Sequence, residues 1–309
     1  MQNFPFPLIG YIINTIKLLW YKIPLSVKLT VLLISITAIS FQYYFYPTSL
    51  FVNSTVSSTY HSTSNTTSPS QSGIAGGTII GNCTCGKKNL PIYSVDNKVN
   101  DDNGNEIKQV SLSFDAAWGD EDTIQILDTL DKYNIKVTFF MTGGWVDAYP
   151  DKVQEIYSRG HDLGNHGENH KNMSKLSASE QSLELSKVHE KVLALTGYDM
   201  YLFRPPYGDY DNTVVTTSYS CNYYPIQWNV DSLDWKDYGA ANIVKTVLNH
   251  KALCNGSIIL LHNGSKFTKD ALEEVIVGLQ EQGYEIVPIS QLIIKENFHM
   301  DTTGKQIAN

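Results

Sequence analysis

Hydrophobic and polar positions alternate with two different periods along the C-terminal two thirds of the chain. Short apolar runs typical of strands occur at 109–114, 136–141, 161–165, 201–204, 223–228, 257–261 and 285–288. Segments with helical spacing lie between them, at 122–133, 151–159, 177–195, 240–249 and 269–282. Strands that alternate with helices indicate a parallel sheet with both faces covered, and this number of strands predicts an α/β barrel.

Local signals mark two helix ends. Ser177 and Glu180 have the spacing of a capping box at the start of the helix predicted over 177–195. Gly283 follows the last predicted helix and is expected to act as its C-cap.

An apolar, almost uncharged run, Leu29–Phe45, lies near the N-terminus. Three lysines precede it, and no Lys or Arg follows until Lys87, so the positive-inside rule places residues 1–28 in the cytoplasm and the remainder outside. No small-residue cleavage site follows the run, which favours a transmembrane signal anchor over 29–47 rather than a cleaved signal peptide. The alternative is a buried core helix.

The segments after this anchor differ in composition. Residues 48–77 are rich in Ser and Thr, bury too little apolar surface to order, and predict a flexible stalk. Residues 78–107 form a lead-in that ends in the turn-like 101–105 and is expected to make a short hairpin. We expect the globular domain at 108–295 and a C-terminal tail at 296–309.

Composition narrows the choice of function. The chain has 309 residues and a formal net charge of -8, so a basic nucleic-acid-binding stripe is not expected. Four cysteines, at 83, 85, 221 and 254, allow disulfides in an extracellular domain, in three connectivities. We favour a Cys221–Cys254 bridge, because each of these cysteines lies just before a strand-like run.

Polar side chains follow several of the predicted strands. They are Asp115, the Arg204–Gly208 segment, the Asp231–Trp235 segment and His262. His166 and His170 lie four residues apart and could bind one divalent metal from the same side. Because the carboxyl ends of parallel barrel strands meet at one rim, these residues are expected to form one catalytic site.

The order of these five motifs resembles the polysaccharide deacetylase family, the NodB-homology carbohydrate esterases of family 4. The resemblance covers about residues 108–295. It implies a distorted (β/α) barrel and a hydrolase that removes N-acetyl groups from a polysaccharide with a divalent metal. Zinc is the metal expected first, with cobalt, manganese and nickel as alternatives.

The resemblance also implies a role for each motif. His166 and His170 bind the metal, Asp115 is the general base, and His262 is the general acid. Arg204 pairs with Asp115, and Asp234 orients and charges His262. On the substrate side, the backbone N–H of Tyr207 faces the developing oxyanion, Pro206 fixes the backbone, and Trp235 forms an apolar wall for the acetyl methyl.

One position departs from the family pattern. The family carries a second Asp directly after the base, as a metal ligand, whereas this chain has Ala116. The metal then has two protein ligands instead of the three that catalytic zinc sites usually have. Asp120, Glu121 or Glu168 could substitute, or water could fill the position. Alternatively, the protein binds glycans and barely hydrolyses them.

The sequence therefore predicts a membrane-anchored, extracytoplasmic, metal-dependent deacetylase. Its expected partner is an N-acetylated cell-wall polysaccharide, with peptidoglycan preferred over chitin oligomers or O-acetylated xylan on location and family grounds. The rival interpretation is a catalytically weak glycan-binding protein with the same fold. The His-Glu-x-x-His order of metalloproteases is absent, and the oligomeric state is not predicted.

Overall fold

The computed structural model describes residues 89–96 and 98–309. Within this part of the chain, no helix is both long enough and apolar enough to span a membrane. The predicted anchor at 29–47 and the predicted stalk at 48–77 lie outside the described residues, as do Cys83 and Cys85.

The sheet is built around the long strand β3 (Glu106–Ala116). On one side, β3 pairs in parallel with β9 (Ser257–His262). On the other side, parallel pairing continues through β4 (Thr138–Met141), β5 (Asp162–Asn165), β6 (Leu202–Phe203) and β7 (Tyr224–Pro225). These strands confirm the parallel α/β core that the alternating pattern predicts.

The segment before β1 (Ser94–Asp96) helps the sheet to curl. Ile92 forms a parallel bridge with Ile226, just after β7, while β1 pairs with β9 at the other side of β3. A single stretch of chain therefore connects the β7 end of the sheet with the β9 side. The result is the distorted barrel that was expected, in which one β1 contact is antiparallel.

Short strands complete the edges. β8 (Val230–Asp231) pairs with β9, and β10 (Tyr284–Ile286) and β2 (Val99–Asn100) pair with the first half of β3. The β2–β3 pair is the hairpin expected around the turn at 101–105. The segment expected to be a tail contributes β11 (Phe298–Met300) and β12 (Lys305–Ala308), and β12 pairs with β1, so it is part of the sheet.

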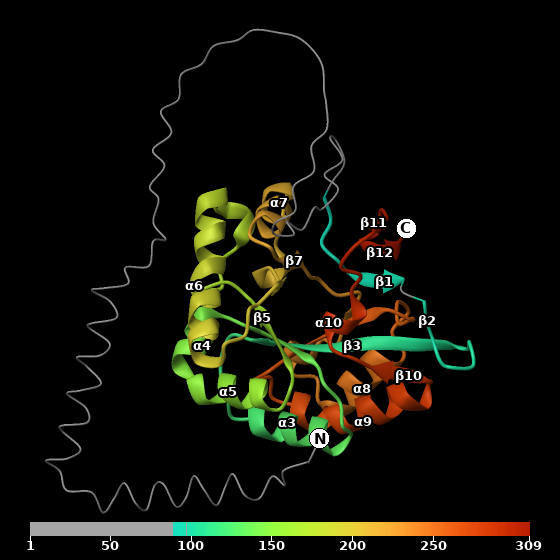
Figure 1. Ribbon diagram of the computed structural model, residues 1–309. Coiled ribbons are helices and arrows are strands. Elements are labelled where there is room, and N and C mark those ends of the chain that lie inside the picture. The colour runs from blue at the N-terminus through green and yellow to red at the C-terminus, as the bar shows by residue number, and fades with distance from the viewer. Residues whose placement is uncertain (1–88, 97) are drawn as a thin grey trace, which may run out of the picture. The chain divides into compact units, whose positions relative to one another are not determined.

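Helices surround the sheet (Figure 1). They are α3 (Thr123–Lys132), α4 (Gly143–Ala148), α5 (Pro150–Ser158), α6 (Ala178–Thr196), α7 (Asn212–Ser220), α8 (Ala240–Leu248), α9 (Thr268–Glu281) and α10 (Ile289–Leu292). Three short 3₁₀ turns follow strands or precede helices: η1 (Met173–Lys175), η2 (Pro206–Gly208) and η3 (Asp234–Lys236). The capping box of Ser177 and Glu180 is confirmed at the start of α6.

Strand β3 shows how the core leads to the site. Its side chains alternate between the two faces of the sheet. Val110, Leu112 and Phe114 are fully buried in the same cluster as apolar residues of α3 and α9. Ser111, Ser113 and Asp115 occupy the intervening positions, where the Ser113 hydroxyl donates to the Ile259 carbonyl over 2.8 Å. The polar face of β3 therefore lies inside the barrel and ends at Asp115.

Two expectations about local structure were wrong. Cys221 and Cys254 are free thiols: the Cys221 sulfur lies 3.5 Å from the Ser182 hydroxyl, and the Cys254 sulfur lies 3.6 Å from the Ser257 hydroxyl. Helix α7 was not predicted, because its sequence NTVVTTSYS is rich in the β-branched residues that favour strands. Its start is nevertheless capped by the Asp211 side chain, which accepts from the Val214 N–H.

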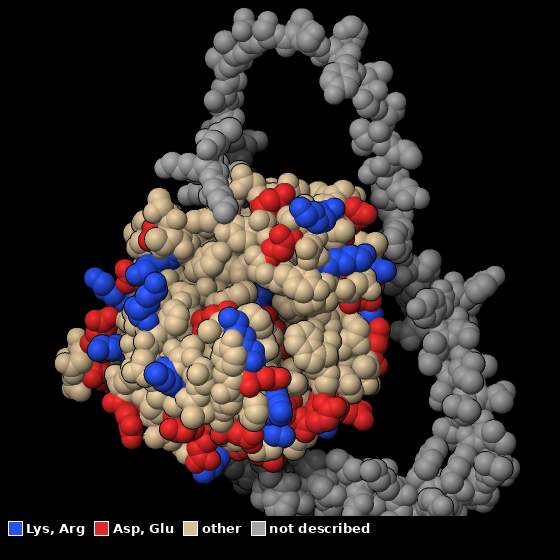
Figure 2. Space-filling view, turned by 180° about the vertical axis from the view of Figure 1, so that it is seen from behind, with Lys and Arg blue, Asp and Glu red and all other residues tan. Residues whose placement is uncertain are grey.

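Charged side chains are mixed on the surface seen in Figure 2, where acidic and basic groups lie among one another. No continuous basic stripe crosses this face of the described domain.

Candidate active site

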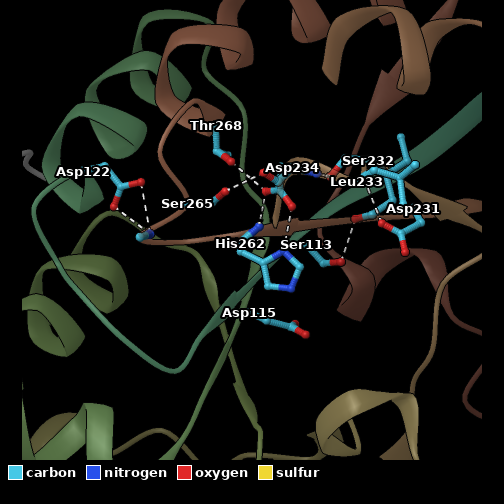
Figure 3. Close-up of polar contacts among 12 residues, drawn as sticks. Ser113, Asp115, Asp122, Asp231, Ser232, Leu233, Asp234, His262, Ser265 and Thr268 are labelled. Atoms are coloured by element: carbon cyan, nitrogen blue, oxygen red, sulfur yellow. Dashed lines mark hydrogen bonds and ion pairs between the residues drawn. The ribbon is translucent and has the colours of Figure 1, made fainter. Parts of the chain in front are cut away.

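Asp115 and His262 end the two central strands side by side. They are register partners in the parallel ladder between β3 and β9, the last pair of that ladder. Both side chains lie near one another at this end of the barrel (Figure 3). Asp115 is buried, and the His262 side chain is 13% exposed, so His262 is the more accessible of the two.

Arg204, which directly follows β6, binds the Asp115 carboxylate. One guanidinium nitrogen donates to Asp115 Oδ1 over 2.7 Å, and the other donates to the Ser113 hydroxyl over 2.8 Å. The guanidinium is fully buried and lies 4.2 Å from the centre of the Phe140 ring. Burial alone would raise the pKa of Asp115, but the charges around it, Arg204 foremost, hold this pKa below its usual range. Asp115 is therefore an ionised, oriented carboxylate.

Asp234 holds His262 in a similar way. Its Oδ1 lies 2.7 Å from His262 Nδ1, and its Oδ2 accepts the His262 backbone N–H over 2.7 Å and the Thr268 hydroxyl over 2.6 Å (Figure 3). Because an ionised carboxylate can only accept, Nδ1 carries the proton and Nε2 is the free end of the ring. Burial lowers the pKa of His262, but the hydrogen bond and charge of Asp234 outweigh it, so the pKa is raised.

The turn that presents Asp234 is shaped locally. Leu233 has a φ of 56°, a left-handed conformation, and its backbone N–H donates to Asp231 Oδ1 over 2.9 Å. Asp231 therefore stabilises the turn. The hydroxyl of Ser265 donates to the Asp234 carbonyl over 3.0 Å from the loop after β9.

His166 and His170 lie in the loop after β5, with ring centroids 5.0 Å apart. His166 Nδ1 lies 2.7 Å from the Arg204 carbonyl oxygen, and a carbonyl can only accept, so Nδ1 is the donor. Burial lowers the pKa of His166 to about 4, which leaves the ring neutral near pH 7. Its Nε2 lone pair then faces Asp115 Oδ2 at 3.5 Å.

Asn165 braces this loop and was not identified from the sequence. Its Oδ1 accepts the Gly167 N–H over 2.9 Å, and its Nδ2 donates to the Leu185 carbonyl over 2.8 Å. Gly167 has a φ of 75°, which favours glycine. Asn165 is fully buried at the end of β5. The sequence signal that could have identified it is its position at the end of a predicted strand, directly before His166.

Comparison with known proteins identifies the family. Residues 102–226 match the model of the polysaccharide deacetylase family. The peptidoglycan-N-acetylglucosamine deacetylase of Bacillus cereus is 33% identical over 188 residues, which are 60% of this chain and 68% of that protein. The chain belongs to the polysaccharide deacetylase family.

Two further similar proteins refine the picture of this family member. The peptidoglycan-N-acetylmuramic acid deacetylase PdaC of Bacillus subtilis is 34% identical over 60% of this chain, but the match spans only 38% of PdaC. The crystal structure of BA3943 from Bacillus anthracis, described as a family 4 pseudoenzyme, matches 65% of this chain and 70% of that one, with 31% identity and a TM-score of 0.58. A mutant of BA3943 is described as having restored enzymatic activity.

The donors that could bind a metal in this domain are the imidazoles of His166 and His170, and the Asp115 carboxylate lies beside His166. His166 Nε2 and Asp115 Oδ2 face one another, and both atoms are electron-rich, so a cation could lie between or beside them. The hydrogen bond from His166 Nδ1 to a backbone carbonyl is typical of a metal-binding histidine. Within 89–96 and 98–309, however, no three His, Cys, Asp or Glu side chains are arranged to hold an ion. The donor chemistry fits a divalent metal, and the number of donors is below that of a usual catalytic site.

Each of the three carboxylates considered as substitutes for the second Asp contacts another neighbour. Glu168 Oε1 lies 2.6 Å from Lys191 of α6, and Asp120 Oδ2 lies 3.7 Å from Lys152 of α5. Glu121 Oε2 accepts the Asp120 N–H over 3.1 Å. Each is therefore engaged with a neighbour, and Ala116, fully buried at the end of β3, leaves its position without a carboxylate.

The predicted substrate-side residues surround the same rim. Pro206 is buried in η2, whereas Tyr207 is 68% exposed, has a φ of 60°, and places its ring centroid 4.4 Å from that of His170. Trp235 is 52% exposed in η3. All the residues predicted for the site thus come together at the carboxyl ends of β3, β5, β6, β8 and β9.

Proposed function

We propose that this protein is a metal-dependent hydrolase that removes N-acetyl groups from a cell-wall polysaccharide. The observation that carries the proposal is the pairing of two oriented groups on neighbouring strands: Asp115 held by Arg204, and His262 held by Asp234. Amide hydrolysis needs a base for the attacking water and an acid for the leaving amine. The pKa of Asp115 is lowered and that of His262 is raised, so the two groups suit these opposite tasks.

In this proposal, His166 and His170 hold the divalent metal. Such an ion polarises the acetyl carbonyl oxygen and makes a bound water more acidic. The Arg204 carbonyl fixes His166 in the tautomer that presents Nε2 to the ion.

The side chains then divide the proton transfers between them. Asp115 accepts a proton from the water whose oxygen bonds to the acetyl carbon. As the carbon–nitrogen bond breaks, protonated His262 donates from Nε2 to the departing amine, and the products are acetate and an amino sugar. Arg204 keeps Asp115 ionised before the attack, and Asp234 keeps His262 protonated until the amine leaves.

Peptidoglycan is the substrate we propose. The support is that the B. cereus and B. subtilis relatives are both named for the deacetylation of this polymer. Because the chain matches only part of PdaC, the sugar that loses its acetyl group stays open between N-acetylglucosamine and N-acetylmuramic acid. Chitooligosaccharides share the N-acetyl group and serve as soluble probes.

A second candidate is a glycan-binding protein that has lost its chemistry. It is favoured by Ala116 and by the lack of a three-donor cluster in the described residues. The similarity to BA3943, described as a pseudoenzyme, supports it independently. Both candidates use the same site and the same class of polymer, and they differ in whether metal is bound and acetate is released.

Metal content and acetate release, measured on one sample of the full chain, test the proposal. The sample would be assayed on N-acetylated peptidoglycan and on chitooligosaccharides, with zinc, with cobalt and with a chelator, and Asp115→Asn would be the matched inactive control. We expect about one metal per chain and chelator-sensitive acetate release that the control lacks. A folded protein with no metal and no acetate would contradict the hydrolase proposal and leave the glycan-binding candidate.

We also propose that the domain is held outside the cytoplasmic membrane by the segment 29–47. The support is the apolar run with lysines on its N-terminal side. Protease treatment of intact cells tests this location: the domain should be cleaved only if it is external, and protection until lysis would contradict it.

A further inference from the structure

Exposed aromatic residues gather at the rim of the site. In the described part of the chain, the large hydrophobic side chains classed as exposed are Trp118, Tyr157, Leu183, Leu193, Tyr207, Trp235 and Tyr238. Four of these, Trp118, Tyr207, Trp235 and Tyr238, lie in the segments that follow β3, β6 and β8, where the candidate catalytic groups are. Exposed apolar side chains that cluster, unlike single scattered ones, are typical of a binding surface, so this arrangement points to one.

Trp118 has a particular position in this set. Its ring is nearly parallel to that of His262, with centroids 6.0 Å apart and an interplanar angle of 20°. It also meets the His170 ring edge to face, with centroids 6.3 Å apart. Trp118 therefore touches both the proposed acid and a proposed metal ligand, yet 51% of it remains exposed.

The loop that carries Trp118 is clamped to the loop after β9. The Gly119 carbonyl accepts from Trp145 Nε1 over 2.7 Å and from Asn263 Nδ2 over 3.1 Å. The Asp122 carboxylate accepts the Gly264 N–H over 2.9 Å (Figure 3). A Cβ at Gly264 would lie 2.4 Å from the Trp118 carbonyl oxygen, so only glycine allows this close approach. These contacts fix the backbone that carries Trp118 before any ligand arrives.

We infer that Trp118 is a substrate-binding residue whose open surface stacks on the pyranose ring of the glycan. This inference rests on the proposed function and deepens it, because it names the group that sets the sugar beside His262. The apolar face of a pyranose suits a flat, rigid indole. The inferred contact needs neither the metal nor the proton transfers, so it can be measured apart from turnover.

The test is the binding of N-acetylated chitotetraose to the full chain, with a chelator present to prevent turnover. Four variants are compared with wild type: Trp118→Ala, Trp118→Leu, Trp118→Phe and, as a control, Tyr157→Ala. Tyr157 is also an exposed aromatic, but it lies on α5 away from the rim. We expect the Ala and Leu variants to raise Kd by roughly two- to tenfold, the range of an aromatic contact. The Phe variant should stay close to wild type, and the control should be unchanged.

The results separate this inference from the proposed function. If wild type binds no oligosaccharide, or if Trp118→Ala binds as tightly or more tightly, the stacking role is wrong even where acetate is released. If Kd follows Trp118 but no acetate is ever released, the stacking role stands and the hydrolase proposal fails.

A second readout is taken on the wild-type protein, and the Trp118→Phe variant is needed only to assign the signal. The indole N–H resonance of Trp118, assigned by its absence in Trp118→Phe, should shift when chitotetraose is added to wild type. An unshifted resonance at saturating ligand would overturn the inference.

Discussion

Asp115 and His262 are direct register partners, and each is held by a partner of opposite charge on its far side. Arg204 bonds to Asp115 over 2.7 Å, and Asp234 bonds to His262 Nδ1 over 2.7 Å. Two adjacent parallel strands thus deliver a carboxylate and an imidazole to the same end of the barrel. Their environments shift their pKa values in opposite directions, which is a common sign of a base and an acid that work together.

Replacement of His262 by Ala should separate catalysis from metal binding. Because His262 is proposed as an acid and not as a ligand, we expect kcat to fall by about 10²- to 10⁴-fold while the metal content stays at the wild-type level. Acetate release and elemental analysis on the same sample measure both quantities. His299→Ala, at an exposed position in β11, is the control. Loss of metal from the His262 variant would contradict the assignment.

The variant Asp234→Asn should change the pH dependence. The pKa of His262 is raised mainly by the Asp234 hydrogen bond and charge, so wild-type His262 stays protonated above its ordinary range. Without that charge the pKa falls, the acid form is lost at lower pH, and the alkaline limb of the kcat/KM profile should move down. Asp231→Asn, which removes a more remote charge, should move it less. An unmoved limb in Asp234→Asn would show that His262 is not the titrating acid.

His166→Ala should remove both metal and activity. With one of two histidine donors gone, zinc affinity should fall by more than the roughly 10- to 100-fold that the loss of an outer-shell partner costs. Titration calorimetry with zinc measures the affinity, and the His299→Ala variant again serves as the control. Metal bound as in wild type would exclude His166 from the site.

The positions of Asp115 and His262, the candidate catalytic residues, were predictable because each one lies near a strand end. A run of buried apolar residues that stops at Asp115 or His262 marks the rim of a parallel sheet without any knowledge of the tertiary structure. The register that sets these two residues opposite one another follows from the same parallel ladder.

The supporting contacts were not predictable in the same way. Thr268 donates to Asp234 from the first residue of α9, across 34 positions of sequence, and no local pattern links the two residues. Glu168 stood as a candidate ligand because it lies between the histidines, but Lys191 of α6 takes its carboxylate. The contact of Ser113 with the site could have been predicted from the sequence, because Ser113 lies two residues before Asp115 on the same face of the strand.

Arg204 and Asp115 should be strongly coupled in stability. Both are buried, so replacement of Arg204 by Met leaves an unpaired carboxylate in the barrel and should lower the free energy of unfolding by about 3–5 kcal/mol. In an Asp115→Asn background the same change should cost clearly less, because no charge is then left unpaired. Urea unfolding of the four proteins of this cycle gives both values. Additive losses would mean that the pair is not coupled.

The Ala116→Asp variant restores the second Asp that the family carries after the base, whose absence separates the two candidate functions. Ala116 is the last residue of β3, directly after Asp115, and is buried in the apolar cluster that contains Phe114, so an added carboxylate supplies the missing donor only if the strand end turns it towards the histidines. We expect zinc affinity to rise by at least the roughly 10- to 100-fold that one outer-shell partner contributes, and acetate release to rise with it if metal limits activity. Ala116→Asn has the same size without the charge and should bind zinc as wild type does. Thermal melts of both variants, with and without zinc, check that each is folded. Equal affinities for the Asp and Asn variants would mean that position 116 does not face the metal. A third donor would then have to come from another part of the chain.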